Sequence, residues 1–561
     1  MRFLRNDDVD SPSAAVLDDI GNGFRDDDSA WPSVLKTSFA GPIILKLHRP
    51  IQTGRLWQNL TDRQLRQTTV ITSCDALRSI GANISRGLSW ERTAVELELF
   101  IRTSPRFDRF RQCKALIIRL DLDGAYLYEN VDGERKATLF YDPISIEGGF
   151  KATHAGYMRG SSAVFTAAVA AVIASADHAQ IGFGIKRGII GARRLLERGF
   201  VEASDGQFSY PKHNLFPAPD EQLFIADEQV PVSPRPQSGE RWRIALTEKS
   251  ADDIAQRFVI EGRSVLERQN LPVGEINKLL TVDRTEIESL RAIRTLFWEY
   301  INNSRSSRPL SVAVFGPPGS GKSFSVSEVA ADISPDARKP LLFNLSEFGS
   351  YSDLVSAFHR VRDRSLLGGT PLVFFDEFDS SFNTQVLGWL RFFLAPMNDG
   401  SFREGETLHP IGKSIFVFAG GIYRDFQRFT KVAQDLSHIK APDFVSRLRG
   451  YVNILGPDPS DSERETGVTQ HKLRRAILLR SILERRAPQL IDDRGRAHID
   501  EEIVWAFLSV SAFRHGVRSM EAIVEMSALG GAREYVRAAL PPPDQLSLHV
   551  DGSEFLSFLR H

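Results

Sequence analysis

Short apolar runs alternate with amphipathic stretches along residues 14–205. Apolar runs predict strands at residues 15–20, 42–47, 68–72 and 115–120. Ser89 is a candidate N-cap, and the apolar positions that follow it recur at helical spacing. Asp123-Gly124 separates two further apolar runs and indicates a hairpin turn. The alternation of strands and helices predicts an α/β domain with a parallel sheet.

A second region of alternating elements lies further along the chain. The expected strands are residues 312–315, 341–345, 372–375 and 414–419, and the expected helices are residues 283–302, 352–364 and 383–394. The polar run NDGSFREGETLHPIGK, residues 398–413, is expected to be a loop. Residues 206–240 are rich in proline and polar side chains, which is typical of a linker.

These patterns predict a five-part chain. Its parts are an α/β domain (1–205), an irregular linker region (206–272), an α/β nucleotide-binding core (273–456), a helical lid (457–540) and a C-terminal tail (541–561). With 561 residues, several domains are expected.

Bulk composition limits the classes of function. Apolar residues make up 42% of the chain and charged residues 25%, with a net charge of −1, so no global field attracts nucleic acid or an anionic membrane. Binding to nucleic acid stays an alternative only at local arginine clusters, such as Arg474-Arg475 with Arg480. A solvated helix face also explains these clusters. The two cysteines favour a cytoplasmic location, and the N-terminus shows no secretory signal. The apolar run at residues 163–174 is too short to span a membrane.

The chemistry centres on a phosphate-binding loop. The sequence Gly316-Pro317-Pro318-Gly319-Ser320-Gly321-Lys322-Ser323 matches G-x-x-x-x-G-K-S between a predicted strand and a predicted helix that continues with Phe324. The glycines allow successive N–H groups to face phosphate oxygens, and the following helix adds its N-terminal dipole. Lys322 is expected to bind the β- and γ-phosphates of ATP, and Ser323 to ligate Mg²⁺.

A pair of acids follows the apolar strand at residues 372–375. Because the carboxyl ends of parallel strands line the ligand crevice, Asp376 is expected to hold Mg²⁺, and Glu377 to orient and deprotonate the attacking water. The two motifs together predict a site that binds and hydrolyses ATP.

From the P-loop to FRHGVRSMEAIVEMS the order of motifs resembles the AAA+ ATPases. Met397-Asn398-Asp399-Gly400-Ser401-Phe402 is similar to a loop of their Clp-like group, and the resemblance covers residues 273–538. It implies a ring-forming homo-oligomer that couples ATP turnover to remodelling or regulation of a macromolecular partner. Arg447, after Pro442-Asp443-Phe444, matches the arginine finger that reaches a neighbouring subunit, with Arg449 as the alternative. Arg518, after Gly516-Val517, matches an arginine that contacts phosphates in its own subunit.

The chain departs from this family in two places. Phe418-Ala419-Gly420-Gly421 stands where a polar first sensor is usual, and the aromatic pore loop of threading unfoldases has no convincing counterpart.

The N-terminal region weakly resembles the ribokinase-like (PfkB) sugar and nucleoside kinases. The shared features are a strand with a glycine turn, IIRLDLDG, and a glycine before a helix of small residues, MRGSSAVFTAAVAAVIA. In Gly160-Ser161-Ser162-Ala163, however, Ala163 takes the place of the family's catalytic aspartate. A small-molecule kinase with a regulatory ATPase domain is the alternative function, and an unrelated α/β domain is equally consistent with this region.

Overall fold

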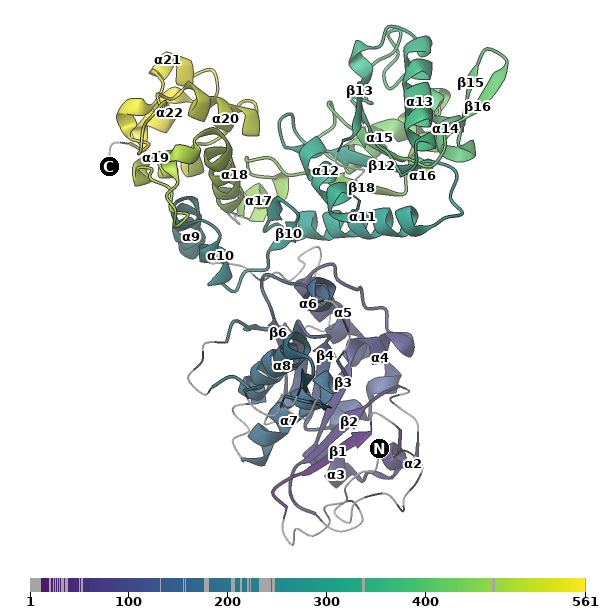
Figure 1. The fold of residues 1–561 in the computed structure, drawn as a ribbon, viewed down its shortest axis with the longest axis vertical. Coiled ribbons are helices and arrows are strands. Elements are labelled where there is room, and N and C mark those ends of the chain that lie inside the picture. Colours follow the sequence, from purple (N-terminus) through teal and green to yellow (C-terminus); the bar gives the residue numbers. More distant parts are fainter. Residues whose placement is uncertain are drawn as a thin grey trace. The chain divides into compact units, whose positions relative to one another are not determined.

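A computed structural model gives the fold of the chain, which divides into two compact units, Met1–Ile244 and Ala245–His561 (Figure 1). The structure describes residues 12–559 except 20–21, 24, 26, 28, 30, 32–34, 36–38, 50, 52–53, 132, 155, 157, 176–180, 203–206, 212–213, 219–220, 222, 232–243, 245–247, 335–338 and 467–469. Among the described residues, no helix is both long and apolar enough to cross a membrane.

The first unit is built on a seven-stranded sheet in the order β1-β2-β3-β4-β5-β6-β9. Its strands are β1 (Ala15–Asp19), β2 (Ile43–Leu47), β3 (Thr68–Ser73), β4 (Ala115–Leu120), β5 (Gly124–Val131), β6 (Glu134–Tyr141) and β9 (Ala226–Gln229). The predicted parallel sheet holds for β1 to β4, but β5, β6 and β9 pair antiparallel. The tight turns before β5 and β6 explain the antiparallel pairing of these two strands, because a short hairpin can join only antiparallel strands. The predicted strand end at residue 20 lies outside the described residues.

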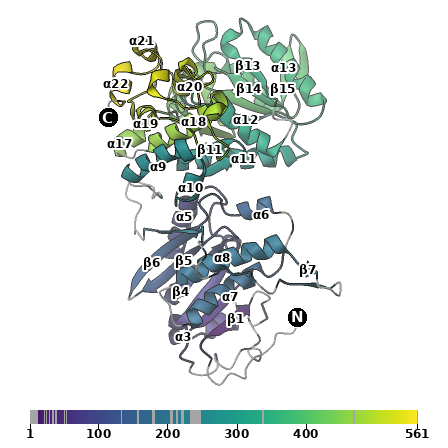
Figure 2. The same ribbon diagram turned by 60° about the vertical axis from the view of Figure 1, so that its left-hand side comes forward.

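Helices cover both faces of this sheet. The helices α7 (Ser161–Ala174) and α8 (Ile181–Arg198) lie along one face (Figure 2). Side chains of β4 alternate: Ile117 packs with α7 and α8, whereas Ile118 packs on the other side with α5 (Trp90–Thr103). Shorter elements complete the unit: α2 (Arg55–Asn59), α3 (Asp62–Gln67), α4 (Cys74–Ser79), α6 (Gly149–Thr153), β7 (Val201–Glu202) and β8 (Phe208–Ser209).

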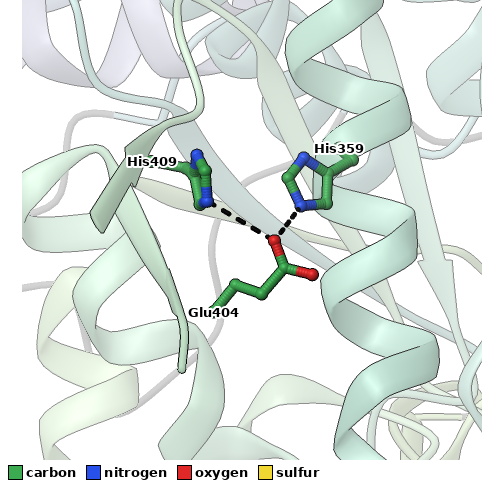
Figure 3. Close-up of side chains that lie close together, drawn as sticks. All are labelled: His359, Glu404 and His409. Carbon is green, nitrogen blue, oxygen red and sulfur yellow. Dashed lines mark hydrogen bonds and ion pairs between the residues drawn. The ribbon is translucent and has the colours of Figure 1, made fainter. Parts of the chain in front are cut away.

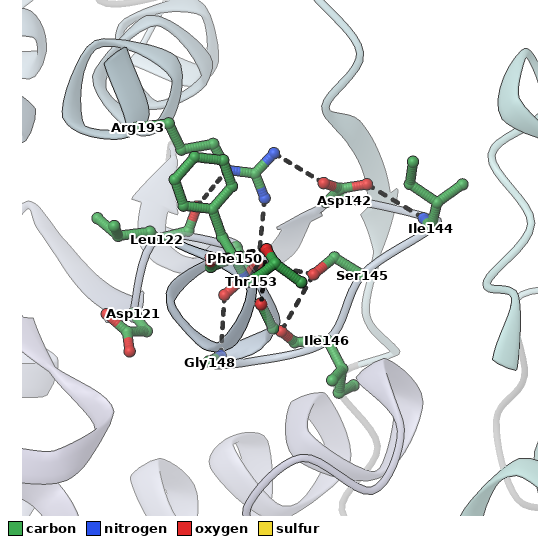
Figure 4. Close-up of polar contacts among 12 residues, drawn as sticks. Asp121, Leu122, Asp142, Ile144, Ser145, Ile146, Gly148, Phe150, Thr153 and Arg193 are labelled. Carbon is green, nitrogen blue, oxygen red and sulfur yellow. Dashed lines mark hydrogen bonds and ion pairs between the residues drawn. The ribbon is translucent and has the colours of Figure 1, made fainter. Parts of the chain in front are cut away.

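A buried carboxylate organises the predicted turn between β4 and β5. Asp123 accepts hydrogen bonds from the Ser145 hydroxyl at 2.7 Å and from the backbone N–H groups of Gly148 and Phe150. Arg193, from α8, pairs with Asp123 and with Asp142, its guanidinium lying over the Phe150 ring (Figure 4). These bonds tie the turn to α6 and α8, so the network serves to hold this edge of the unit together.

The second unit contains a five-stranded parallel sheet in the order β13-β14-β17-β12-β18. Its strands are β12 (Leu310–Phe315), β13 (Leu341–Asn344), β14 (Leu372–Asp376), β17 (Ile415–Ala419) and β18 (Gly450–Asn453). The associated elements are β10 (Gly274–Ile276), β11 (Leu279–Thr281), α11 (Arg284–Asn302), α12 (Lys322–Ile333), α13 (Tyr351–Leu366), α14 (Leu394–Asp399), α15 (Phe426–Asp435) and α16 (Ala441–Arg447). The four predicted strands and the first two predicted helices of this region are present.

Two expectations for this unit are wrong. Residues 383–394 do not form a helix, because Asn383, Thr384 and Leu387 have left-handed backbone angles, and only a 3₁₀ turn at Leu390–Phe393 leads into α14. Residues 398–413 are not a simple loop but contain the hairpin of β15 (Ser401–Glu404) and β16 (Thr407–Pro410).

Helices C-terminal to the sheet share one apolar core with flanking segments. They are α18 (Gln470–Arg486), α19 (Glu501–Ser509), α20 (Val517–Met526), α21 (Pro543–Leu546) and α22 (Gly552–Ser557), whereas the polar helix α17 (Asp461–Thr466) contributes no residue to this core. The same core contains α9 (Glu248–Glu261) and α10 (Ser264–Glu267) from before the sheet, and the last residues described, such as Phe555 and Leu559. The five-part division of the sequence stays a prediction.

The arginine cluster of α18 is structural. Arg474, Arg475 and Arg480 are at most 6% exposed. Arg475 donates to the carbonyls of Pro457, Leu508 and Val510 and pairs with Asp458. Both interpretations of this cluster, a solvated face and a nucleic-acid face, are therefore wrong for these three residues, which tie the helices to one another.

Candidate nucleotide-binding site

The P-loop turns between β12 and α12 through two glycines with left-handed backbone. Gly319 has φ 70°, and a Cβ there would lie 2.6 Å from the carbonyl oxygen of His515. Gly321 has φ 85° and is the N-cap of α12. Because left-handed backbone disfavours any residue with a Cβ, the motif needs glycine at both positions.

Lys322 lies at the first position of α12 and folds back over its own loop. Its Nζ donates to the carbonyls of Gly316 at 3.0 Å and Pro317 at 3.2 Å. Burial lowers the pKa of Lys322, while Asp376 and Asp379 act in the opposite direction. The ammonium group is therefore partly desolvated, which strengthens its interaction with an anion.

Asp376 ends β14, and β17 separates this strand from β12. Burial raises the pKa of the Asp376 carboxyl, and Lys322 opposes that rise. Glu377 is exposed and has φ 51°, so the chain turns sharply directly after the strand. Both acids interact electrostatically with Lys322, and the side chain of Glu377 lies beside Gly421, just after the end of β17.

One cavity of about 720 Å³ brings these residues together. Of the residues expected from the sequence, those lining it are Pro318, Gly319, Ser320, Gly321, Lys322, Ser323, Phe324, Asp376, Glu377 and Arg518. Gly316, Pro317 and Arg447 are not in its lining, although Gly316 and Pro317 contact Lys322. Ser323 and Asp376, the expected Mg²⁺ ligands, offer a hydroxyl and a carboxylate, which are oxygen donors of the kind that Mg²⁺ prefers.

Arg518 reaches the cavity from the start of α20. The backbone N–H of Val517 donates to the Gly319 carbonyl at 3.2 Å, and a Cβ on Gly516 would lie 2.8 Å from the Pro318 carbonyl oxygen. The helical region thus packs directly on the P-loop, with exposed Arg518 beside the phosphate-binding backbone.

Arg447 lies elsewhere, at the end of α16. It donates to the Asp443 carbonyl at 2.7 Å, and its side chain is 27% exposed. Arg449, the alternative finger, is exposed just before β18. Neither arginine is in the lining of the cavity of its own chain.

Asp379 is a functional candidate that the sequence analysis missed. It is fully buried and accepts hydrogen bonds from the backbone N–H groups of Gly421, Ile422 and Tyr423, at 2.8 to 3.2 Å. A Cβ on Gly420 would lie 3.2 Å from its carboxylate. The Asp379 carboxylate therefore occupies the space beside the glycines that replace the polar first sensor. The signal in the sequence was an acid two residues after the Asp376-Glu377 pair.

Glu286 is a second missed residue in the cavity lining. Its carboxylate accepts from the Thr281 hydroxyl at 2.5 Å and from the backbone N–H of Leu455 at 3.2 Å. Burial raises the pKa of Glu286 to about 7. No sequence pattern distinguishes Glu286, because a glutamate on an amphipathic helix is usually solvated.

Comparison with known families agrees with this geometry. Residues 312–402 match the family model described as "ATPase family associated with various cellular activities (AAA)". This stretch is an AAA ATPase domain. The predicted α/β fold class with an AAA+ core is confirmed, as is the prediction of an ATPase at the level of this domain.

The chain also matches curated relatives. A "Proteasome-associated ATPase" of Acidothermus cellulolyticus is 25% identical over 179 residues, covering 26% of this chain and 31% of the relative. The protein of the same name from Frankia casuarinae is 25% identical over 163 residues, covering 23% and 27%. The matched segment spans less than a third of each relative. Among solved structures, the chain is similar to NtrX from Brucella abortus in complex with ATP, at 13% identity over 46% of this chain and 58% of NtrX. The TM-score is 0.31, and a TM-score this low carries no conclusion.

Proposed function

We propose that this protein hydrolyses ATP in the P-loop cavity and couples the turnover to rearrangement of a macromolecular partner. The observation that carries the chemistry is the convergence of Lys322, Asp376 and Glu377 on one cavity beside the P-loop backbone. The N–H groups of the loop and Lys322 bind the phosphates, and Arg518 adds a second cation from α20. Ser323 and Asp376 would hold Mg²⁺, which neutralises charge on the phosphate oxygens.

Glu377 acts on the attacking water in this proposal. It is exposed and borders the cavity, so its carboxylate can accept a proton from water, whereas half-buried Asp376 faces Lys322. Asp379 positions the loop at Gly421, against which Glu377 packs.

The coupling to a partner rests on the family. The match to the AAA family supports an ATPase that acts on another macromolecule. The relatives are named as proteasome-associated, so we favour a protein as that partner. We further propose a ring-shaped homo-oligomer in which Arg447 serves the neighbouring subunit. A cytoplasmic location agrees with the two free, buried cysteines.

Two substitutions test the chemistry. Lys322→Ala should abolish nucleotide binding, because it removes the cation that binds phosphate in the ground state. Glu377→Gln should leave nucleotide affinity within about twofold and lower turnover at least about 100-fold, because a positioned general base contributes that much. Fluorescent-nucleotide titration and steady-state ATPase assays measure the two quantities. Wild-type turnover in Glu377→Gln would remove the assigned role.

The kinase alternative for the first unit is less well supported. Ala163 lies exposed in the first turn of α7, and its methyl group cannot accept a proton from a sugar hydroxyl. The ribokinase-like resemblance therefore stays a prediction of a degenerate ribokinase-like domain and is not a proposed activity.

A further inference from the structure

Two histidines and a glutamate converge where α13 meets the hairpin of β15 and β16. His359 extends from α13, while Glu404 and His409 extend from β15 and β16 of the hairpin that follows α14. The carboxylate of Glu404 lies between the two rings, with its Oε2 2.9 Å from Nε2 of His359 and 3.4 Å from Nε2 of His409 (Figure 3). One ligand atom from each residue lies within 4.8 Å of those of the other two.

Two of the three ligand-to-ligand distances are close to those of a tetrahedral metal site, and the third is at most 4.8 Å. With metal–ligand bonds of about 2.0–2.2 Å, neighbouring ligand atoms of a tetrahedral zinc ion are about 3.3 Å apart. Both distances to Glu404 fall near this value, and the glutamate side chain is 56% exposed and can adjust. Two imidazoles with one carboxylate are ligands that suit zinc and its transition-metal neighbours better than Mg²⁺ or Ca²⁺.

We propose that His359, Glu404 and His409 bind a divalent transition-metal ion of the zinc type, which clamps the β15–β16 hairpin onto α13. The three residues come from segments 45 and 50 positions apart along the chain, so a bound ion cross-links the hairpin to the helix. Phe402 supports the arrangement, because its buried ring packs edge-on to His359 and stacks on His409. None of the three ligands is in the lining of the nucleotide cavity, so the role is structural or regulatory and not catalytic.

Arg362, one turn after His359, opposes the ion. Its Nη1 lies 3.3 Å from Nδ1 of His409, which therefore acts as the acceptor and leaves the proton on Nε2. A histidine that binds metal through Nε2 carries its proton on Nδ1, so Arg362 has to turn away. The arginine can do so, because it is 28% exposed and already lies 3.4 Å from the Asp363 carboxylate. Arg362 is thus the residue that sets the affinity of the site.

The test uses the full chain without nucleotide, titrated with Zn²⁺ by calorimetry and with Co²⁺ by visible absorption. The wild type should bind one Zn²⁺ that His359→Ala or His409→Ala weakens at least about 100-fold, and Co²⁺ should give the absorption of a tetrahedral site. Glu406→Gln, in the same hairpin and fully outside the cluster, should bind like the wild type. Arg362→Gln should bind several-fold more tightly, because it removes a cation and frees Nδ1 of His409.

Circular dichroism of each variant separates lost ligands from lost folding. Ligand variants that fold but bind Zn²⁺ with wild-type affinity would overturn the proposal, as would a wild type without saturable binding. Binding that is lost equally in Glu406→Gln would also overturn it, because the ion would then be held elsewhere on the hairpin.

Discussion

Asp379 fixes the loop that follows β17 through a single buried carboxylate. We expect Asp379→Ala to lower the free energy of unfolding by about 2–4 kcal/mol, because three backbone N–H groups lose a charged acceptor in a buried place. Turnover should fall more than nucleotide affinity, since Glu377 packs on this loop, whereas the proposed phosphate-binding groups lie in the P-loop. Thermal unfolding and ATPase assays measure both effects.

Asp379→Asn is the matched control for shape. It keeps an oxygen acceptor but loses the charge, so its losses in stability and turnover should be smaller than those of alanine. If alanine leaves turnover unchanged, the loop does not position Glu377.

Glu286 gives stability a pH dependence of its own. The pKa of Glu286 is raised to about 7 in the folded chain, from about 4.5 when unfolded, so the folded state keeps this proton up to a higher pH than the unfolded state does. Stability from this group is therefore complete below pH 4.5 and is lost as the pH rises through 7. Glu286→Gln should remove that loss and stabilise the protein at pH 8 relative to the wild type by up to about 3 kcal/mol.

Melting temperatures of wild type and Glu286→Gln at pH 5 and pH 8 check this expectation. The gain should appear at pH 8 and shrink at pH 5, where the wild-type carboxyl is largely protonated. A difference that is the same at both values would mean that burial does not shift the pKa of this group.

At the scale of elements, buried arginines hold the helical region together. Arg475→Met should destabilise it by about 3–5 kcal/mol, because three carbonyls and the Asp458 carboxylate lose their donor. Arg485→Met is the control from the same helix: this arginine is exposed and pairs with Glu521 at the surface, so its loss should change stability by less than about 1 kcal/mol. Urea titrations followed by circular dichroism distinguish them, and equal effects would contradict the structural role.

Strands such as β12 and β14 were predictable because a strand buried on both faces is a continuous apolar run, whereas β6, β9 and β18 were not predicted. Residues 383–394 were wrongly predicted as a helix, because threonine and leucine do not by themselves favour the left-handed backbone angles found at Thr384 and Leu387. The hairpin of β15 and β16 was missed because its side chains are mostly polar and exposed.

The candidate site could be predicted where chemistry demands a fixed spacing, as in the P-loop and the Asp376-Glu377 pair. Asp379 and Glu286 escaped because their roles come from burial, which a single carboxylate in a sequence does not reveal. The arginines of α18 were misjudged for the same reason: helical spacing shows that Arg474 and Arg480 share a helix but not that its neighbours cover them.

At the scale of the whole molecule, two arginines predict different behaviour in an assembly. Arg518 lines the cavity of its own chain, whereas Arg447 lies on α16, outside that lining. In the proposed ring, a head-to-tail contact brings Arg447 to the ATP of the neighbouring subunit. Its guanidinium then neutralises charge on the transferred phosphoryl group, an effect on the order of 10³-fold in rate or more.

Arg447→Ala should therefore lose hydrolysis by about that factor while each subunit still binds ATP. Mixing it with Lys322→Ala subunits should restore part of the activity, because an intact Arg447 from one chain meets an intact P-loop in the other. Arg518→Ala should not be rescued by an intact Arg518 on a neighbour, since this arginine serves its own cavity. ATPase rates that do not depend on protein concentration, no rescue on mixing and a monomer by light scattering would leave Arg447 as an arginine that only caps the end of its helix.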